Sequence, residues 1–213
     1  MAFVKKIEIE QGTIGIWQLN ESSEDMTKNF NFSNDEAIQF DKLKLEKRKR
    51  EFLAVRFLLK ILLKNKTELF YGENGNPHLK NSPLNISISH SAELAVIFLS
   101  NVNCGIDTEN ITRNTLKIAT RYLNHEELET TQKNNEPALA RIIYWGAKEA
   151  IYKCALEKEI EFNNHIYLEY FAVNDTGSFG GKLQYGNNNL RFFNLWYTFF
   201  GNNVIVYCVE KFE

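Results

Sequence analysis

Residues 85–109 read NISISHSAELAVIFLSNVNCGIDTE, and this stretch decides the fold class. It contains three strand-like runs, Asn85–His90, Leu94–Ser100 and Cys104–Glu109, joined by short links. Short links favour antiparallel neighbours, so the sequence predicts an antiparallel meander. In a meander the first and third strands point the same way, which would place their ends at one sheet edge, about 10 Å apart.

Helical patterns flank this stretch on both sides. Apolar residues recur at helical spacing from about Asp35 to Lys64, and helical signals occupy Thr115–Thr131 and Pro137–Lys158. Met1–Leu19 alternates weakly and predicts one or two strands, while the polar segment Asn20–Asn34 reads as a loop.

The second half of the chain repeats the order of the first. Its last helix is followed by four further strand-like runs, His165–Val173, Gly181–Gln184, Leu190–Phe199 and Val204–Val209. We therefore expect an α+β fold of two similar units, residues 1–102 and 103–213, each with a long helix on a small, mostly antiparallel sheet.

Composition narrows the class of protein. The chain has 213 residues, 44% of them hydrophobic and 24% charged, which excludes disordered and fibrous proteins. A net charge of -2 predicts no nucleic-acid partner. The apolar stretch Phe52–Leu63 is interrupted by Arg56 and Lys60 and is shorter than the roughly 20 residues of a membrane span. With no visible signal peptide, the sequence predicts a soluble cytoplasmic protein without a membrane partner.

The number and spacing of the cysteines indicate a role in core packing. Cys104, Cys154 and Cys208 are widely spaced and form no CxxC motif. This pattern argues against a disulfide framework and against a zinc site, so all three are expected to be small core residues.

Two acids end the third strand of the stretch. On a strand, Asp107 and Glu109 point to one face about 7 Å apart. Either they are unrelated acids at a solvated strand end, or a hard divalent cation offsets their charges, for which Mg²⁺ with substrate phosphates is the best match. His90 is either a hydrogen-bonded structural residue or a phosphate contact, and the shared sheet edge favours the contact.

The helix Pro137–Lys158 presents a second group of charges. At 100° per residue, Ile143, Ala147, Ala150 and Cys154 form a core stripe, and the opposite side carries Trp145, Glu149, Tyr152 and Lys153. Glu149 and Lys153 are then either an ordinary i,i+4 ion pair or, if this side faces the strand acids, a third carboxylate and a phosphate-binding cation.

Cations are also concentrated at the start of the first long helix. Lys42–Arg50 is either a solvated face or a surface for an anionic ligand, and Arg56, between Val55 and Phe57, is expected to have an anionic partner. Carboxylates, a histidine, a lysine and arginines together suit phosphoryl chemistry on a polyanionic ligand.

These motifs occur in the order of a known family. The sequence resembles the surfactin-synthetase-activating (Sfp) type of 4'-phosphopantetheinyl transferase in five blocks, Arg48–Arg56, Gly75–Leu79, Ile88–Ser91, Gly105–Glu109 and Trp145–Lys153. The resemblance implies a pseudo-dimer with coenzyme A in the cleft between a nucleotide-side half and a half carrying the transferase motifs. It also implies transfer of the phosphopantetheine arm to a serine of an acyl, peptidyl or aryl carrier protein, with release of adenosine 3',5'-bisphosphate. An internal pseudo-dimer needs no second chain, so a monomer is expected.

The resemblance also assigns roles to residues. It implies that Asp107, Glu109 and Glu149 hold Mg²⁺, and that Glu149 and Lys153 are catalytic. Glu149 is then the base for the serine, either directly or through a metal-bound water. The implied coenzyme A contacts are Arg48, Arg56, Asn76, Ser89, His90, Asp107 and Lys153, the two arginines lying near the 3'-phosphate. Asn76 stands where the family commonly has lysine, a change expected to weaken coenzyme A binding by about 1 kcal/mol.

Two other functions fit the same residues. One is a non-catalytic module that binds coenzyme A or a carrier protein, and the other is a metal-dependent phosphoesterase. The carrier and its pathway, tolerance of acyl-coenzyme A and the affinities do not follow from the sequence.

Overall fold

The computed structural model describes residues 3–64, 68–186 and 189–211. From the N-terminus, the first ten elements among the described residues are β1 (Phe3–Ile9), β2 (Gly12–Gln18), α1 (Ser23–Thr27), α2 (Asn34–Asp41), α3 (Glu46–Leu63), β3 (Leu69–Tyr71), β4 (Pro77–Leu79), β5 (Asn85–His90), β6 (Leu94–Ser100) and β7 (Cys104–Asn110). The remaining elements are the 3-10 helix η1 (Leu116–Ile118), α4 (Ala119–Tyr122), α5 (His125–Gln132), α6 (Pro137–Ala155), α7 (Phe162–His165), β8 (Ile166–Leu168), β9 (Thr176–Tyr185), β10 (Asn189–Phe200) and β11 (Asn203–Lys211).

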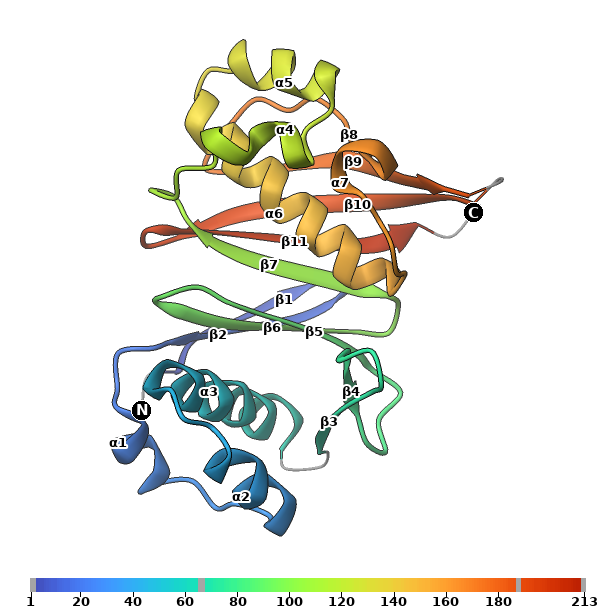
Figure 1. The fold of residues 1–213 in the computed structure, drawn as a ribbon. Helices are drawn as coiled ribbons and strands as arrows, with labels where there is room; N and C mark the ends of the chain where they lie inside the picture. Colours follow the sequence, from blue (N-terminus) through green and yellow to red (C-terminus); the bar gives the residue numbers. More distant parts are fainter. Residues whose placement is uncertain (1–2, 65–67, 187–188, 212–213) are drawn as a thin grey trace.

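Two antiparallel sheets organise the molecule. The N-terminal sheet has the order β1-β2-β6-β5, and the C-terminal sheet has the order β7-β11-β10-β9-β8. Figure 1 shows the layers: α3 lies below the N-terminal sheet, the two sheets lie face to face, and α6 crosses the outer face of the C-terminal sheet. The predicted α+β class is confirmed, whereas the pseudo-dimer and the unit boundary at residues 102 and 103 stay predictions.

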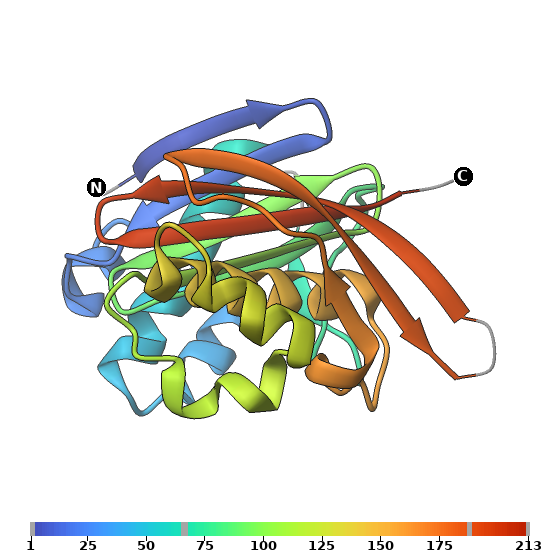
Figure 2. The same cartoon turned by 90° about the horizontal axis from the view of Figure 1, so that it is seen from above.

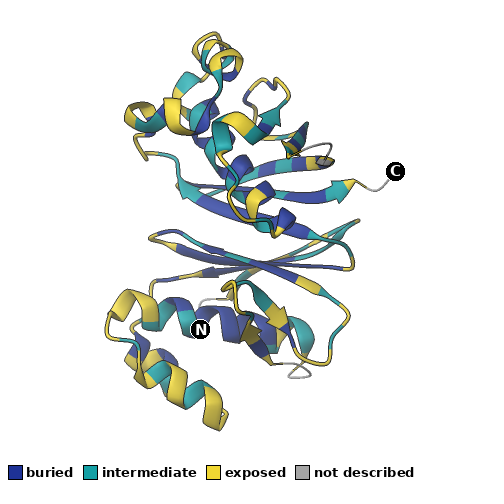
Figure 3. Ribbon diagram, turned by 45° about the vertical axis from the view of Figure 1, so that its right-hand side comes forward, coloured by how far each residue is buried: buried dark blue, intermediate teal, exposed yellow. Residues whose placement is uncertain are grey.

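Strand alternation explains why the sheets pack face to face. On β6, Ala95, Ile97 and Leu99 pack toward α3, while Leu94, Val96 and Phe98 pack toward the other sheet. On β11 the even-numbered residues face α6 and the odd-numbered ones face the N-terminal sheet. Because both faces of these central strands are covered, their side chains are almost all buried (Figure 3).

The view from above shows how far the sheets overlap. In Figure 2 the β1–β2 hairpin lies beside β10 and β11 at the edge of the stack. Ile14 and Ile16 of β2 join Ile205 and Val209 of β11 in one buried cluster. This shared core joins the two sheets into one body.

The meander predicted for residues 85–109 is wrong for its third strand. β5 and β6 pair as expected, but β7 pairs with β11 in the C-terminal sheet. A short link fixes only the distance between strand ends, so β7 can cross to the second sheet, where Gly105–Glu109 pairs with Val204–Cys208. β5 and β7 still lie side by side, because each forms an edge of its own sheet.

Other expected elements differ in detail. Residues expected as a loop contain α1, which begins at the N-cap Ser22, and the helix expected from Asp35 to Lys64 is divided into α2 and α3. The Glu46 carboxylate accepts hydrogen bonds from the backbone N–H and hydroxyl of Ser23, which fixes α1 against the start of α3. Met1 and Ala2 of the first expected strand lie outside the described residues.

The second half departs from expectation in the same way. Helical signals at Thr115–Thr131 form η1, α4 and α5, because the Asn124 capping box starts a new helix. Only Ile166–Leu168 of the strand expected at His165–Val173 is extended in the sheet, and β9 is longer than expected. Among the described residues, no helix combines the length and the apolar character that crossing a membrane requires.

Candidate active site

The acids of β7 face α6 because the strand alternates. Cys104 and Ile106 point into the core between the sheets, so Gly105, Asp107 and Glu109 point to the opposite face. A Cβ at Gly105 would lie 1.9 Å from the carbonyl oxygen of Ala150. Only glycine therefore allows α6 to pack this closely on β7.

Two serines connect the facing edges of the sheets. The backbone N–H of Ile106 donates to Ser87 Oγ at 3.0 Å, and that of Thr108 donates to Ser89 Oγ at 3.3 Å. Ser87 and Ser89 are two residues apart on β5, and so are Ile106 and Thr108 on β7. The N–H groups of Ile106 and Thr108 point away from β11, so the serines can accept hydrogen bonds from them. We call these two contacts the serine seam.

Asp107 is held from both halves of the molecule. The side chain is buried, and its Oδ1 accepts hydrogen bonds from Ser89 Oγ and from Lys153 Nζ, both at 2.8 Å. Lys153 also donates to the carbonyl oxygen of Ile106 at 3.0 Å. Asp107 Oδ2 is buried without a hydrogen-bond partner.

Glu109 is oriented by an aromatic and a cationic neighbour. Its Oε1 accepts a hydrogen bond from Trp145 Nε1 at 2.8 Å and forms an ion pair with Arg113. The Arg113 guanidinium also lies over the Trp145 ring, 4.8 Å from its centroid. Arg113 lies just beyond the strand acids and belongs to none of the sequence motifs described above.

Glu149 of α6 belongs to the same group of charges. Burial raises its pKa, and the carboxylates of Asp107 and Glu109 raise it further, against the opposing effect of Lys153. The predicted core stripe of α6 is buried, and the side with Glu149 and Lys153 faces the strand acids, which favours the second of the two readings of this pair.

The donor set suits a hard divalent cation. Within residues 3–64, 68–186 and 189–211, no three His, Cys, Asp or Glu side chains are arranged to hold a metal ion by themselves. Mg²⁺ needs no such cage, because it commonly binds one or two carboxylates together with waters and substrate phosphates. The unpartnered Asp107 Oδ2 and the adjacent Glu149 are carboxylate oxygens of the required kind.

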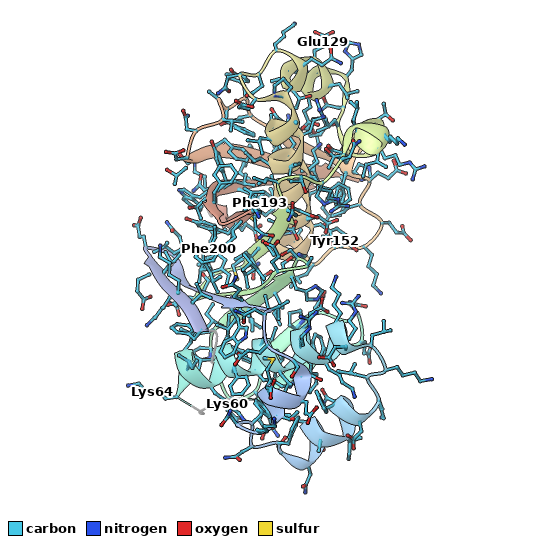
Figure 4. All side chains as sticks on the ribbon, turned by 90° about the vertical axis from the view of Figure 1, so that its left-hand side faces the viewer. Lys60, Lys64, Glu129, Tyr152, Phe193 and Phe200 are labelled. Atoms are coloured by element: carbon cyan, nitrogen blue, oxygen red, sulfur yellow. The ribbon has the colours of Figure 1, made fainter. Side chains whose placement is uncertain are left out.

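A cleft of about 570 Å³ leads away from Lys153. Its walls come from the segment 71–77, from β5 and from the end of α6, and they include Asn76, His90, Tyr152 and Lys153. Figure 4 shows Tyr152 where the two halves meet, whereas Glu129 lies at the outer end of the molecule. Lys153 links this cleft to the site carboxylates, because it lines the cleft and donates to Asp107 Oδ1.

His90 lies where this cleft meets a smaller pocket. Its Nδ1 is 3.4 Å from Glu51 Oε1, and its Nε2 is 3.4 Å from Arg48 Nη1. Arg48 also donates to Glu51 Oε2 at 2.8 Å. Burial lowers the pKa of His90, an effect that Glu51 opposes. The smaller pocket, about 280 Å³, is lined by Arg48, His90, Arg56 and Tyr71 among others.

Arg56 has the anionic partner expected for it, but it is not exposed like Arg48. Only 3% of Arg56 is accessible, and its Nε lies 3.4 Å from Glu36 Oε1. The guanidinium donates to Gln39 and lies 3.2 Å from the Phe52 ring centroid. Burial lowers the pKa of Arg56 to about 10. Glu36, Gln39 and Phe52 therefore already contact the Arg56 guanidinium. The role of Arg56 at a 3'-phosphate stays a prediction.

Lys148 points away from the acids although it precedes Glu149. Its Nζ is fully buried and donates to Glu127 Oε2 at 2.6 Å and to the carbonyl oxygens of Ile166 and Phe162. The core stripe of α6 is wider than the expected four residues, and this buried ion pair was not predicted.

The cysteines behave as core residues, as expected. All three are free and buried, and burial raises the pKa values of Cys104 and Cys208. The raised pKa values of Cys104 and Cys208 suit packing and not nucleophilic chemistry.

The charges of the site suit one kind of chemistry. The buried Asp107 contacts Lys153, which lines the cleft, and Glu149 lies beside them, an arrangement that suits transfer chemistry on a phosphate-bearing substrate. Residues 103–196 match a family model described as the 4'-phosphopantetheinyl transferase superfamily. No curated protein matches the chain. The matched segment contains Asp107, Glu109, Glu149 and Lys153, so the part of the chain that carries these residues is similar to the 4'-phosphopantetheinyl transferase superfamily.

Proposed function

We propose that this protein transfers the 4'-phosphopantetheine arm of coenzyme A to a serine hydroxyl of an apo carrier protein, as in the Sfp-type enzymes that its motifs resemble. The observation that carries the proposal is the group of Asp107, Glu149 and Lys153, in which Lys153 lines the cleft and its Nζ lies 2.8 Å from Asp107 Oδ1. The match of residues 103–196 to the superfamily model supports the reaction class, and the group supplies the charges that the reaction needs.

In the proposed reaction, the carrier serine oxygen forms a bond to the phosphorus next to the pantetheine arm. The bond from this phosphorus to the bridging oxygen breaks, and adenosine 3',5'-bisphosphate leaves with the electron pair. Glu149 accepts the serine proton, a role suited to a carboxylate whose pKa is raised by burial and by neighbouring acids. Lys153 offsets negative charge on the phosphates, and Arg48 and His90 bind other anionic groups along the cleft.

Asp107 and Glu149, with Glu109 beside them, are the residues proposed to hold Mg²⁺. When bound, the ion would neutralise charge on the phosphate oxygens and on the leaving group. We expect coenzyme A binding to be weakened by the absence of a lysine at Asn76, since this position lines the cleft.

Intact mass spectrometry of several apo carrier proteins, incubated with this protein, coenzyme A and Mg²⁺, tests the proposal. We expect a mass gain of one phosphopantetheine arm that disappears when EDTA removes the metal. Asp107→Ala and Glu149→Gln should retain the fold and lower turnover about 100-fold or more. Glu126→Gln, an exposed acid on α5 away from the site, is the control and should leave turnover unchanged.

Other outcomes would indicate the alternatives. Coenzyme A binding without labelling of any carrier would favour the non-catalytic module. Release of phosphopantetheine without a protein acceptor would favour a phosphoesterase. Wild-type turnover in both site variants would contradict the proposed roles of the carboxylates.

A further inference from the structure

The C-terminal end of α6 forms part of the cleft wall. Lys153 lies in its last turn, and Leu156, Glu157 and Lys158 continue the wall beyond the helix. The last carbonyl groups of a helix have no partner within it. Leu156, which follows the helix, has a φ of 58°, the left-handed conformation with which many helices end. The terminal carbonyl groups of α6 can therefore accept hydrogen bonds from donors outside the helix.

Arg191 of β10 supplies that contact. Its Nη1 donates to the carbonyl oxygen of Ala155 at 2.9 Å, which caps the end of α6. The same nitrogen lies 3.6 Å from Glu157 Oε1, so the guanidinium also holds the first turn of chain beyond the helix. Neither contact belongs to a motif identified in the sequence.

Glu210 of β11 orients the arginine. Arg191 Nε and Nη2 donate to the two carboxylate oxygens of Glu210 at 2.6 and 2.7 Å, a bidentate pair. Asn103 Nδ2 donates to Glu210 Oε2 at 3.1 Å, and the backbone N–H of Glu210 donates to the carbonyl oxygen of Asn103. We call Asn103, Glu210 and Arg191 the brace.

The brace runs from the link between the two halves to the end of α6. Asn103 lies between β6 and β7, at the point where the chain passes from one sheet to the other. Asn103 also lines a pocket of about 230 Å³ that contains Lys153, Leu156 and Ile86, and these last three residues line the larger cleft as well. Both ends of the brace therefore reach the region where coenzyme A is proposed to bind.

We propose that Arg191 is a positioning residue: held by Glu210, it fixes the end of α6 so that Lys153 and residues 156–158 form one wall of the ligand cleft. This inference rests on the proposed function for its ligand and on the contacts of the brace for its geometry. Lysine cannot replace Arg191, because the bidentate pair and the helix cap together use three nitrogens of one planar group.

Hydrogen–deuterium exchange of the backbone amides of residues 153–159 tests the positioning directly. Arg191→Met and Arg191→Lys should raise exchange of these amides about tenfold relative to the wild type, because opening of this segment becomes easier. The control is Phe179→Leu, which weakens packing against Phe171 and Tyr197 and does not touch the brace. Each protein is measured at the same interval below its own Tm.

Steady-state kinetics with an apo carrier protein provide the second readout. We expect Arg191→Met to raise KM for coenzyme A about tenfold and to lower kcat by less than about threefold, because the variant disturbs ligand binding more than chemistry. Arg191→Lys should behave like Arg191→Met, and Phe179→Leu should leave KM unchanged.

The outcomes separate this inference from the function on which it rests. Equal acceleration in Phe179→Leu, or no acceleration in the Arg191 variants, would overturn the positioning role. Faster exchange with an unchanged KM would overturn the claim that the brace shapes the coenzyme A cleft. If the wild-type protein neither binds coenzyme A nor labels a carrier, the proposed function fails, and the exchange comparison still decides whether the brace positions this wall.

Discussion

Asp107 shows at the scale of one residue how the two halves act together. Its Oδ1 accepts one hydrogen bond from Ser89 in the N-terminal sheet and one from Lys153 on α6, both at 2.8 Å. The carboxylate therefore has its orientation only when the halves are assembled. Its second oxygen stays buried and unpartnered, so it remains free for a ligand.

A buried ion pair beside the site gives a prediction about stability. Lys148→Met should lower the free energy of unfolding by about 3–5 kcal/mol, because the buried Glu127 carboxylate loses its charge partner. Urea denaturation followed by circular dichroism measures the change. The double variant Lys148→Met/Glu127→Gln is the comparison and should recover part of the loss. A single variant within about 1 kcal/mol of the wild type would contradict the role of the pair.

The Arg191–Glu210 pair gives a prediction about pH. The hydrogen bonds from Arg191 lower the pKa of Glu210 in the folded protein. A lowered pKa contributes stability above the unfolded-state pKa, and this contribution is lost as the pH falls through the folded value. Glu210→Gln should therefore lose stability at pH 7 but much less at pH 3, as measured by Tm. A loss of equal size at both pH values would argue against the charged pair.

At the scale of elements, the approach of α6 to β7 depends on one missing side chain. Gly105 lets the backbone of α6 at Ala150 lie against the strand, and this contact brings Glu149 opposite Asp107. Because α6 and β7 are both regular at this contact, a shift of either element would also move its site residues, Glu149 on α6 or Asp107 on β7.

Gly105→Ala should therefore impair stability and activity together. Its Cβ would meet a backbone oxygen at 1.9 Å, which only a shift of α6 can relieve, and we expect a loss of about 1–3 kcal/mol. Gly72→Ala is a matched control, because there the nearest atom, at 3.2 Å, belongs to the movable His78 side chain. Comparing the Tm values of the two variants decides the point, and equal small shifts would show that the close approach is unimportant.

At the scale of the whole molecule, side chains connect two sheet edges. β5 and β7 do not form a ladder with each other, and the serine seam supplies hydrogen bonds between them. Together with the apolar core between the sheets, the seam sets the register of one half against the other. The mutual position of His90 and Asp107 follows from this register.

Removing the seam should weaken the joint between the halves. The double variant Ser87→Ala/Ser89→Ala leaves the N–H groups of Ile106 and Thr108 without partners, at about 1–3 kcal/mol for each buried group. Chemical denaturation measures the total, and hydrogen exchange at these two amides measures the local effect. Ser178→Ala on β9 is a control away from the seam. Unchanged exchange at both amides would refute this account of the joint.

Periodicity explains which parts of the site were predictable. Alternation places Asp107 and Glu109 on one face of a strand, and helical spacing separates Glu149 and Lys153 from the core stripe of α6. Both patterns are local, so they survive whatever the chain packs against. The contact between the end of β5 and the acids has a different origin from the expected meander, since Ser89, next to His90, donates to Asp107 across the edges of two different sheets.

The partners of individual charges were not predictable in this way. In the sequence, nothing distinguishes Arg113, Arg191 and Lys148 from ordinary surface cations. In the structure, each makes specific contacts with groups 4 to 36 residues away. Such contacts depend on which elements pack together in the folded chain, and this cannot be derived from the local pattern of one sequence.

The sequence alone determined the α+β class, the faces of the central strands and of α6, and the motif order that resembles the 4'-phosphopantetheinyl transferases. Only the tertiary structure decided that β7 joins the second sheet, that serine side chains bridge the sheet edges, and that Arg56 and Lys148 are buried. The physical reason is range: periodicity follows from backbone geometry within one element, whereas burial and ion pairing follow from packing between elements far apart in the chain.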